Sequence, residues 1–307
     1  MPTPSSCRAE TPRLSIVIPS YKRADLLRRS LETVVAHAPA QTEIIVVDDA
    51  SENETISRTA SSFRHVKTLC LPQRSGFCVA ANRGVAAAQA PIVELLNDDT
   101  EVEPGWAEAA LECFQAENVV AVAPLVLKLP RSEEPRIDSA GDCYHPGGFA
   151  SKRGHGQLLS TFPLQPGSVF GASASSAFYR RDWLLRVGAF PESFGSYFED
   201  VDLSFRLRRA GGEIVFEPRS RVWHYAHASH RRMDRRLLEQ QSRNEELVFW
   251  RNTPPRQYWK ALPLHAMVLF GKVLRRRREG TMAPFLLGRC RAFATLPHLI
   301  RRRLQSH

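Results

Sequence analysis

Along residues 14–127, short apolar runs alternate with segments in which apolar residues recur three and four positions apart. The apolar runs are rich in Val, Ile and Leu and have the length of buried strands, whereas the spaced pattern is typical of helices. This alternation predicts a mostly parallel, Rossmann-like α/β sheet with helices on both faces. The predicted strands are residues 14–20, 42–51, 66–71, 90–99 and 119–127, and the predicted helices are residues 24–37, 54–63, 76–90 and 104–116.

From residue 130 to residue 170 the pattern gives way to a stretch rich in Gly, Pro and Ser, which predicts loop structure that can include a β-hairpin. A strand of small residues followed by a helix is expected across residues 171–190. A further helix is expected across residues 196–212, where Gly211–Gly212 would end it. The last predicted strand begins at residue 213.

The chain has 307 residues, of which 43% are hydrophobic, enough for one large domain or for one domain with an appendage. None of its six cysteines stands in a C-x-x-C pair. A chain of this size does not need a disulfide framework, so reduced thiols and a cytoplasmic location are expected. Residues 1–13 contain no apolar segment of the kind that forms a signal peptide.

The positive charge is concentrated at the C-terminal end. Residues 231–307 contain 18 Lys and Arg against 5 Asp and Glu, whereas the other 230 residues contain 24 against 27. The longest uncharged stretch in this region, residues 261–271, is shorter than the roughly 20 residues that a membrane-spanning helix needs. The region is therefore expected to bind negatively charged surfaces without crossing a bilayer.

Acidic residues gather where two of the predicted strands end. Asp48 and Asp49 close one strand, and Asn97, Asp98 and Asp99 follow another. Both groups are expected at the carboxyl edge of the sheet, where parallel sheets bind their ligands. An Asn-Asp-Asp run is also typical of a surface turn. Neighbouring carboxylates equally suit a hard cation such as Mg²⁺ or Mn²⁺.

The pair Asp48 and Asp49 has two interpretations of its own. Asp49 or Ser51 could cap the helix that follows, or the acidic pair could accept hydrogen bonds from a base or a ribose. The first strand is followed by PSYKRAD and lacks the G-x-G-x-x-G pattern, which disfavours a dinucleotide cofactor and leaves a single nucleotide open.

The helix expected across residues 196–212 begins with acidic residues. Asp202 and Arg206 stand four positions apart and are expected to pair on the helix surface. Glu199 and Asp200 lie in the first turn, where they either favour the helix dipole or serve as a general base at the edge of the crevice.

Three histidines, His224, His227 and His230, follow the last predicted strand. A single histidine in such a position is more often structural. The three together could form a zinc cluster, although neither a cysteine nor an H-E-x-x-H motif accompanies them.

Taken together, these segments resemble the inverting, GT-A-fold glycosyltransferases of family 2, and among them bacterial rhamnosyl- and galactofuranosyltransferases. The resemblance covers roughly residues 13–230 and implies a flexible tail at residues 1–12 and a basic helical region at residues 231–307. The segments that carry it, in the family's order, are SIVIPSYKR, EIIVVDDAS, GFCVAANRG, VELLNDDTEVEPGW, GAFPESFGSYFEDVDLSFRLRRAG and RVWHYAHAS.

The resemblance also implies a role for each matching residue. Asp99 would bind the Mg²⁺ or Mn²⁺ ion together with His224. Asp200, with Glu199 beside it, would be the catalytic base that takes a proton from the acceptor hydroxyl in a single displacement. The residues that would bind the nucleotide-sugar donor are Pro19, Tyr21, Asp48, Asp49, Arg74, Gly76, Asn82, Asn97 and Asp98.

The sequence departs from the family's pattern at several positions. Asn97 and Pro191 stand where many relatives have Asp, and Arg74 stands where relatives often have Asn. Processive members carry Q-x-x-R-W and membrane-spanning helices, whereas here Asn244 follows the segment 240–243 and no spanning helix is predicted. Transfer of one sugar per encounter is therefore expected.

The basic C-terminal region has three interpretations. Its apolar positions and its arginine clusters at residues 275–278 and 301–303 suit peripheral binding to an anionic membrane. They also suit a helical appendage packed on the catalytic domain. Nucleic-acid binding is disfavoured because few aromatic residues stand among the arginines. A membrane location fits a lipid-linked acceptor in bacterial surface polysaccharide synthesis.

Two functions other than glycosyl transfer fit parts of the sequence. A non-catalytic nucleotide-binding or membrane scaffold relative is favoured by Asn97 and Pro191 and disfavoured by the retention of Asp99, Asp200 and His224. A sugar-1-phosphate nucleotidyltransferase is disfavoured because the first loop contains no glycine. The motifs fit dTDP-rhamnose, UDP-galactofuranose and UDP-hexose donors alike.

Overall fold

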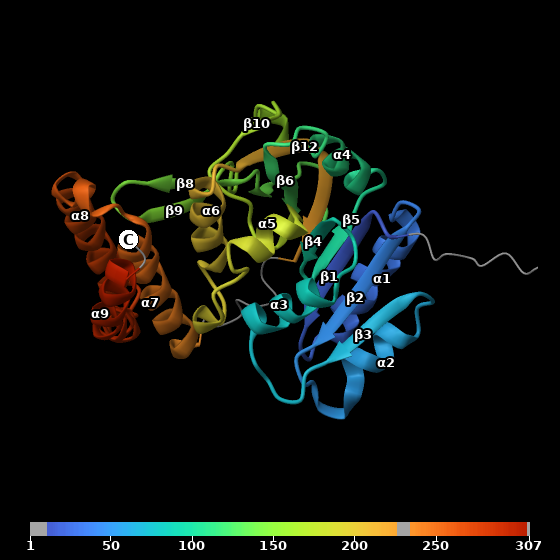
Figure 1. The fold of residues 1–307 in the computed structure, drawn as a ribbon, viewed down its shortest axis with the longest axis horizontal. Helices are drawn as coiled ribbons and strands as arrows, with labels where there is room; N and C mark the ends of the chain where they lie inside the picture. The colour runs from blue at the N-terminus through green and yellow to red at the C-terminus, as the bar shows by residue number, and fades with distance from the viewer. Residues whose placement is uncertain (1–10, 226–233, 306–307) are drawn as a thin grey trace, which may run out of the picture.

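The computed structural model describes residues 11–225 and 234–305, with side chains up to residue 295. Within this part of the chain, a ten-stranded mixed sheet has the strand order β10-β12-β6-β11-β4-β1-β2-β3, with β5 beside β12 and β7 beside β6 (Figure 1). Its strands are β1 (Leu14–Ser20), β2 (Thr42–Asp48), β3 (Val66–Cys70), β4 (Ile92–Leu96), β5 (Thr100–Val102), β6 (Val119–Lys128), β7 (Ile137–Ser139), β10 (Gly167–Ser168), β11 (Ser176–Arg180) and β12 (Glu213–His224).

Helices cover both faces of this sheet, as the sequence pattern predicts (Figure 1). A separate hairpin is formed by β8 (Asp142–His145) and β9 (Phe149–Lys152). The helices are α1 (Ala24–His37), α2 (Thr55–Ser61), α3 (Phe77–Ala87), α4 (Trp106–Cys113), α5 (Arg181–Arg186), α6 (Glu199–Arg209), α7 (Arg235–Asn252), α8 (Tyr258–Arg278) and α9 (Met282–Gln305).

The central strand β1 shows why the sheet needs two helical layers. All seven of its residues are buried. Successive side chains of a strand point to opposite faces, so Ile16 and Ile18 enter the core that contains α1 and α4 residues, while Val17 enters the core on the α3 side. Gly84 of α3 lies against Val17, where an added Cβ would come within 2.2 Å of the valine side chain. The near-continuous apolar run in the sequence therefore follows from burial on both faces.

The predicted parallel sheet is confirmed for one half and modified in the other. Strands β3, β2, β1 and β4 run parallel, and β6 runs parallel to β12. Strand β11 lies antiparallel between β4 and β6 and joins the two parallel groups. The stretch predicted as loop from residue 130 to residue 170 contains β7, the β8–β9 hairpin and β10. These strands have two to four residues each, too short for periodicity to reveal.

One carboxyl group is buried inside the sheet. Glu94 of β4 is fully buried and accepts hydrogen bonds from Trp106 Nε1 at 3.2 Å and from Ser176 Oγ at 3.0 Å. Burial raises the pKa of Glu94 to about 8, although both hydrogen bonds oppose this shift. The side chain is therefore neutral near pH 7 and links β4 to α4 and β11.

The C-terminal helices form a block at the end of the molecule where the β8–β9 hairpin and α6 lie (Figure 1). Nδ1 of His265 on α8 lies 2.8 Å from the carbonyl oxygen of Gly147 at the hairpin tip. Asn252 of α7 donates a hydrogen bond to Asp202 of α6 at 3.1 Å. The C-terminal region is thus helical, as predicted, and it contacts the hairpin and α6. No helix among the described residues is long and apolar enough to span a bilayer.

Candidate active site

The first part of the site lies where β1 and β4 end side by side. Asp98 and Asp99 follow β4, and both are almost fully buried. Asp98 accepts a hydrogen bond from Ser20 Oγ at 2.7 Å, and Arg23 contacts both carboxylates, with its Nη1 2.8 Å from Asp99 Oδ2. Burial raises the pKa of Asp98 to about 6 against the opposing charge of Arg23. The Asp98–Asp99 pair is therefore held together by a guanidinium that the sequence analysis had not singled out.

His224, the last residue of β12, lies between two carboxylates. Its Nε2 is 3.2 Å from Asp99 Oδ1, and its Nδ1 is 3.1 Å from Asp138 Oδ2. Burial lowers the pKa of His224, but hydrogen bonding to Asp138 and Asp99 outweighs this, and the net shift is upward. Burial likewise raises the pKa of Asp99 and of Asp138, yet hydrogen bonding to His224 dominates and holds both below their usual range.

The Asp99–His224 pair fits a divalent metal ion. Oδ1 of Asp99 is buried and, apart from His224 Nε2, has no hydrogen-bond partner among residues 11–225 and 234–305. Ligands at right angles with bonds of about 2.1 Å lie about 3 Å apart, close to the 3.2 Å between this oxygen and His224 Nε2. Within the described chain, no group of three or more His, Cys, Asp or Glu side chains could hold a metal. The described residues thus offer two ligands, which suits an ion that also binds substrate phosphates.

Only one of the three histidines considered for a zinc cluster belongs to the described residues. His224 lies in the site, whereas His227 and His230 fall outside the described residues.

The second part of the site is the beginning of α6. Asp200 accepts hydrogen bonds from the backbone N–H groups of Ala174 at 3.0 Å and Val201 at 2.8 Å. Glu199 is buried, and its Oε2 finds no partner in the described part of the chain. Burial raises the pKa of Asp200, of Glu199 and of the nearby Asp142, and the charge of Asp200 raises the last two further. The N–H donors of Ala174 and Val201 favour the ionised form of Asp200 and oppose the effect of burial.

Lys152 of β9 connects the two parts. Its Nζ lies 2.8 Å from Asp138 Oδ2, and its positive charge lowers the pKa values of Asp138, Asp142 and Asp200. Sequence reasoning missed Asp138, Asp142 and Lys152, because all three lie in the stretch predicted as loop. The sequence signal is weak, because only two aspartates four positions apart mark the segment DSAGDCYH.

The expected nucleotide side of the site lies at the ends of β1 and β2. The guanidinium of Arg74 lies over the ring of Tyr21, 4.3 Å from its centroid. Asp49 accepts hydrogen bonds from the backbone N–H groups of Ser75 at 2.6 Å and Gly76 at 2.9 Å. Gly76 has a φ of 88°, which favours glycine at this turn. These contacts bring Tyr21, Asp49, Arg74 and Gly76 together.

Asp48 makes contacts of a different kind from its neighbour Asp49. Its carboxylate accepts hydrogen bonds from Ser51 N and from Ser57 Oγ, both at 2.8 Å. Asp48 thus fixes the turn that leads into α2. The alternative in which Asp49 or Ser51 caps the helix is not found, because the Asp49 carboxylate binds Ser75 and Gly76 and Ser51 makes no side-chain cap.

The other residues named from the sequence make mainly structural contacts. Asn82 of α3 accepts a hydrogen bond from Phe190 N and donates one to Phe190 O, both at 2.9 Å. The backbone N–H of Asn97 donates to Ser175 O at 3.0 Å. Pro19 lies within β1, paired in register with β2. Asp202 pairs with Arg206 as predicted, with 2.9 Å between Oδ2 and Nε.

The turn before α6 has an unusual backbone that α7 holds in place. Tyr197 and Phe198 have φ values of 69° and 66°, a left-handed conformation that bulky residues rarely adopt. The side-chain nitrogen Nδ2 of Asn244 on α7 donates hydrogen bonds to the carbonyl oxygens of Phe194 at 2.9 Å and Tyr197 at 3.0 Å. Strain of this kind persists only where the surroundings fix it. Helix α7 thus determines the position of the residues that lead directly into Glu199 and Asp200.

Residues 15–188 match the family described as Glycosyl transferase family 2. The chain belongs to this family. The pre-mycofactocin glycosyltransferase of Mycobacterium tuberculosis is 31% identical over 213 residues, which make up 69% of this chain and 42% of the relative. Polypeptide N-acetylgalactosaminyltransferase 13 of Rattus norvegicus is 26% identical over 242 residues, or 70% of this chain and 42% of the relative. The chain therefore spans less than half the length of these curated relatives.

Two solved structures share the fold. GalNAc-T7 with UDP, GalNAc and Mn²⁺ superposes with a TM-score of 0.62 at 16% identity, covering 78% of this chain and 48% of the other. The mannosyltransferase PcManGT from Pyrobaculum calidifontis in complex with GDP-Man and Mn²⁺ gives a TM-score of 0.58 at 15% identity, covering 93% of this chain and 88% of the other. The predicted GT-A fold and glycosyltransferase class are thereby confirmed.

Proposed function

We propose that the chain transfers one sugar per encounter, with inversion, from a nucleotide diphosphate sugar to a hydroxyl of a glycan or glycolipid acceptor. The observation that carries the proposal is the buried oxygen of Asp99 beside Nε2 of His224, together with the partly buried carboxylate of Asp200. Asp99 and His224 suit a metal-bound diphosphate, and Asp200 suits a general base.

The donor is assigned by chemistry and by analogy. Tyr21 and Arg74 form a flat, stacked surface beside Asp49, which suits a base and a ribose. The two solved neighbours hold UDP or GDP-Man, which supports a nucleotide diphosphate sugar here. The motifs fit dTDP-rhamnose and UDP-sugars, the donors of the rhamnosyl- and galactofuranosyltransferases that the sequence resembles.

Asp99 and His224 would hold Mg²⁺ or Mn²⁺, and Mn²⁺ in both solved neighbours supports such an ion. When bound, the ion neutralises the diphosphate leaving group, so that this group leaves without being protonated. Arg23 adds a second positive charge at the same carboxylates.

The choice of base follows from the hydrogen bonds of the carboxyl groups. Two N–H donors favour the ionised form of Asp200, which takes the proton of the acceptor hydroxyl as its oxygen attacks the anomeric carbon. The ionised forms of Glu199 and Asp142 are disfavoured beside it, because burial and the charge of Asp200 raise their pKa values. A single carboxylate therefore acts as the base, with Lys152 limiting its basicity.

The place of action that fits best is an anionic membrane surface, as in bacterial surface polysaccharide synthesis. Helix α8 exposes large apolar side chains, with Trp259 72%, Met267 71% and Phe270 65% exposed. Arg277 and Arg278 are exposed at the end of the same helix. An apolar helix face flanked by arginines matches the interface and headgroups of anionic lipid.

Sedimentation with phosphatidylglycerol vesicles tests this location. The chain should pellet with anionic vesicles and not with phosphatidylcholine vesicles, and the double substitution Trp259→Ser and Phe270→Ser should weaken pelleting. Leu185→Ser, at an apolar site on α5 that is 42% exposed, is the control. Equal pelleting with both lipids, or with all variants, would remove the membrane from the proposal.

Donor binding and hydrolysis by the purified chain test the enzyme. A panel of dTDP-, UDP- and GDP-sugars is offered with Mn²⁺, Mg²⁺ or EDTA. Asp99→Ala should abolish metal-dependent binding, whereas Asp200→Asn should bind the donor and not turn it over. Asp182→Asn removes an exposed carboxylate of α5 and is the control. Binding without turnover in the unmodified chain, with every acceptor, would favour the non-catalytic nucleotide-binding or scaffold relative.

A further inference from the structure

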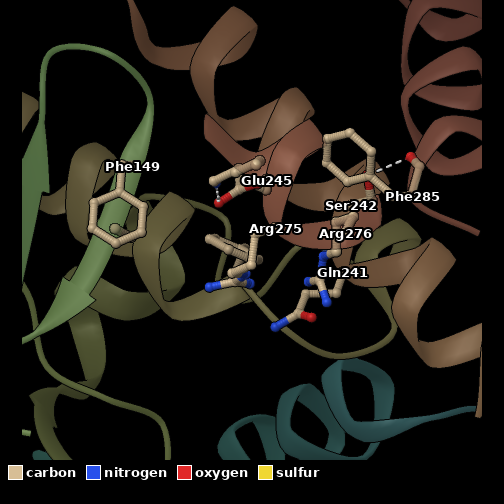
Figure 2. Close-up of a pocket in the computed structure, with 10 residues that line it drawn as sticks. Phe149, Gln241, Ser242, Glu245, Arg275, Arg276 and Phe285 are labelled. Atoms are coloured by element: carbon tan, nitrogen blue, oxygen red, sulfur yellow. Dashed lines mark hydrogen bonds and ion pairs between the residues drawn. The ribbon is translucent and has the colours of Figure 1, made fainter. Parts of the chain in front are cut away.

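A pocket lies between the β8–β9 hairpin, the turn before α6 and the three C-terminal helices (Figure 2). Its cavity volume is about 140 Å³, below the roughly 300–1,000 Å³ of pockets that enclose a drug-sized ligand, so it has room for one small group of a ligand that extends through its mouth. Its lining residues are Phe149, Ala150, Phe198, Gln241, Ser242, Glu245, Lys272, Arg275, Arg276 and Phe285.

The pocket carries an excess of positive charge from α8. Arg275 and Arg276 share a single carboxylate, that of Glu279, at 3.4 Å and 3.0 Å. Lys272 pairs with Glu245, which also pairs with Arg289. Burial lowers the pKa of Lys272, the charge and hydrogen bond of Glu245 oppose this shift, and the charges of Arg289 and Arg275 add to it. An anion would therefore be stabilised between the two guanidinium groups.

The remaining lining suits an uncharged part of the same ligand. Figure 2 shows Gln241 beside Arg276, with Phe149 and Phe285 on opposite sides of the pocket. Oε1 of Gln241 is buried and accepts no hydrogen bond from the described residues, so it is available to a ligand hydroxyl. The two phenylalanine rings offer apolar surface. Together these groups suit a ligand that joins an anionic group to a sugar or an alkyl chain.

The pocket adjoins the proposed base through two shared elements. Phe198, which lines it, directly precedes Glu199 and Asp200. Ala150, also in the lining, lies two residues before Lys152 on β9 and therefore on the same face of that strand. A ligand held here thus lies next to the elements that carry the base and its cationic neighbour.

We propose that this pocket is the acceptor subsite and that Arg275 and Arg276 bind a phosphate group carried by the acceptor. The assignment of the pocket to the acceptor rests on the proposed function, whereas the binding of a phosphate group in it does not. A phosphorylated lipid and a soluble sugar phosphate share this chemistry.

Two probes distinguish these sources: decyl phosphate below its micellar concentration, and glucose 1-phosphate. Binding to the full chain is measured by calorimetry in EDTA, so that metal-dependent binding at the donor site does not contribute. The double variant R275Q/R276Q should weaken binding by about tenfold or more, since two charge-assisted hydrogen bonds are lost. R275K/R276K should retain most of it. The matched control is R28Q/R64Q, which removes the same charge from two exposed positions that do not line the pocket.

The two probes identify the source of the phosphate. Tighter binding of decyl phosphate than of glucose 1-phosphate identifies a lipid phosphate, and the reverse identifies a soluble sugar phosphate. Failure of both probes to bind, or equal loss in R275Q/R276Q and R28Q/R64Q, overturns the proposal. Donor hydrolysis with Mn²⁺ is measured on the same samples. Its absence in the unmodified chain would contradict the proposed function and leave the phosphate result standing.

Discussion

His224 and Asp138 are 86 residues apart in the sequence, yet Nδ1 of the imidazole lies 3.1 Å from a carboxylate oxygen of the aspartate. A proton on Nδ1 that is donated to Asp138 leaves the lone pair of Nε2 directed at Asp99. Carboxylates in this position fix the tautomer and the orientation of metal-binding histidines. Asp138 is therefore a positioning residue for the proposed metal site.

Asp138→Asn should weaken metal binding without abolishing catalysis. Loss of a carboxylate that orients a metal ligand typically costs about 10–100-fold in affinity. The Mn²⁺ concentration that gives half-maximal donor hydrolysis should rise by that factor, while the rate at saturating Mn²⁺ stays within a few-fold of the original. Asp182→Asn should change neither quantity. An unchanged Mn²⁺ dependence would show that Asp138 does not act through His224.

The sequence predicts the elements whose apolar pattern is long and burial-driven. Strand β1 and helix α1 begin and end at the predicted residues, 14–20 and 24–37, because each places a regular set of side chains in a core. The antiparallel insertion of β11 was not foreseen, since a strand of small residues looks the same in either direction.

Only part of the candidate site can be predicted from the sequence, because some of its residues lie on very short strands. Asp99, Asp200 and His224 stand in recognisable segments, whereas Asp138 and Lys152 lie on strands of three and four residues. Arg23 stands inside the quoted motif PSYKRAD, but its pairing with Asp98 and Asp99 depends on how β1 and β4 are placed in the sheet. Contacts between distant short segments have no local sequence signature.

Glu94→Gln should make the protein less sensitive to alkaline pH. The folded chain keeps the Glu94 proton up to about pH 8, whereas the unfolded chain releases it near 4.5. Between these values the folded state binds more protons, so the stability of the original protein falls as pH rises. The variant has no such proton to lose. Its free energy of unfolding in urea should match the original at about pH 4 and exceed it by at least about 1 kcal/mol at about pH 8.5.

A control variant separates the effect of titration on stability from the effect of altered packing. Burial raises the pKa of Glu43, but the hydrogen bond from Lys67 and other partners outweigh it and lower the pKa below 4.5. The stabilisation by this carboxylate is complete above about pH 4.5 and is lost as pH falls below that value. Glu43→Gln should therefore be less stable than the original above about pH 4.5 and approach it at lower pH, the opposite sign. If Glu94→Gln differed from the original by the same amount at both pH values, Glu94 would not be buried in its neutral form.

Asn244→Ala should release the turn before α6. The Asn244 amide contacts the carbonyl oxygens of Phe194 and Tyr197, and these oxygens would be left without that donor. The expected cost is about 1–3 kcal/mol in unfolding free energy. Turnover should fall more than donor affinity, because the turn positions Asp200 and not Asp99. Arg236→Ala, on the exposed side of α7, should leave both unchanged. An equal fall in donor affinity would contradict a selective role.

Arg23→Gln should make the stability of the protein depend on a metal ion. Arg23 neutralises Asp98 and Asp99, and its loss leaves two neighbouring buried carboxylates without that charge. In EDTA the variant should unfold several degrees below the original, because one or two kcal/mol shift Tm by that amount in a protein of this size. Mn²⁺ should restore most of the difference, since the ion replaces the lost positive charge. Arg28→Gln, an exposed arginine of α1, is the control. If Mn²⁺ raised the Tm of the variant and of the original by the same amount, the ion would not bind at these carboxylates.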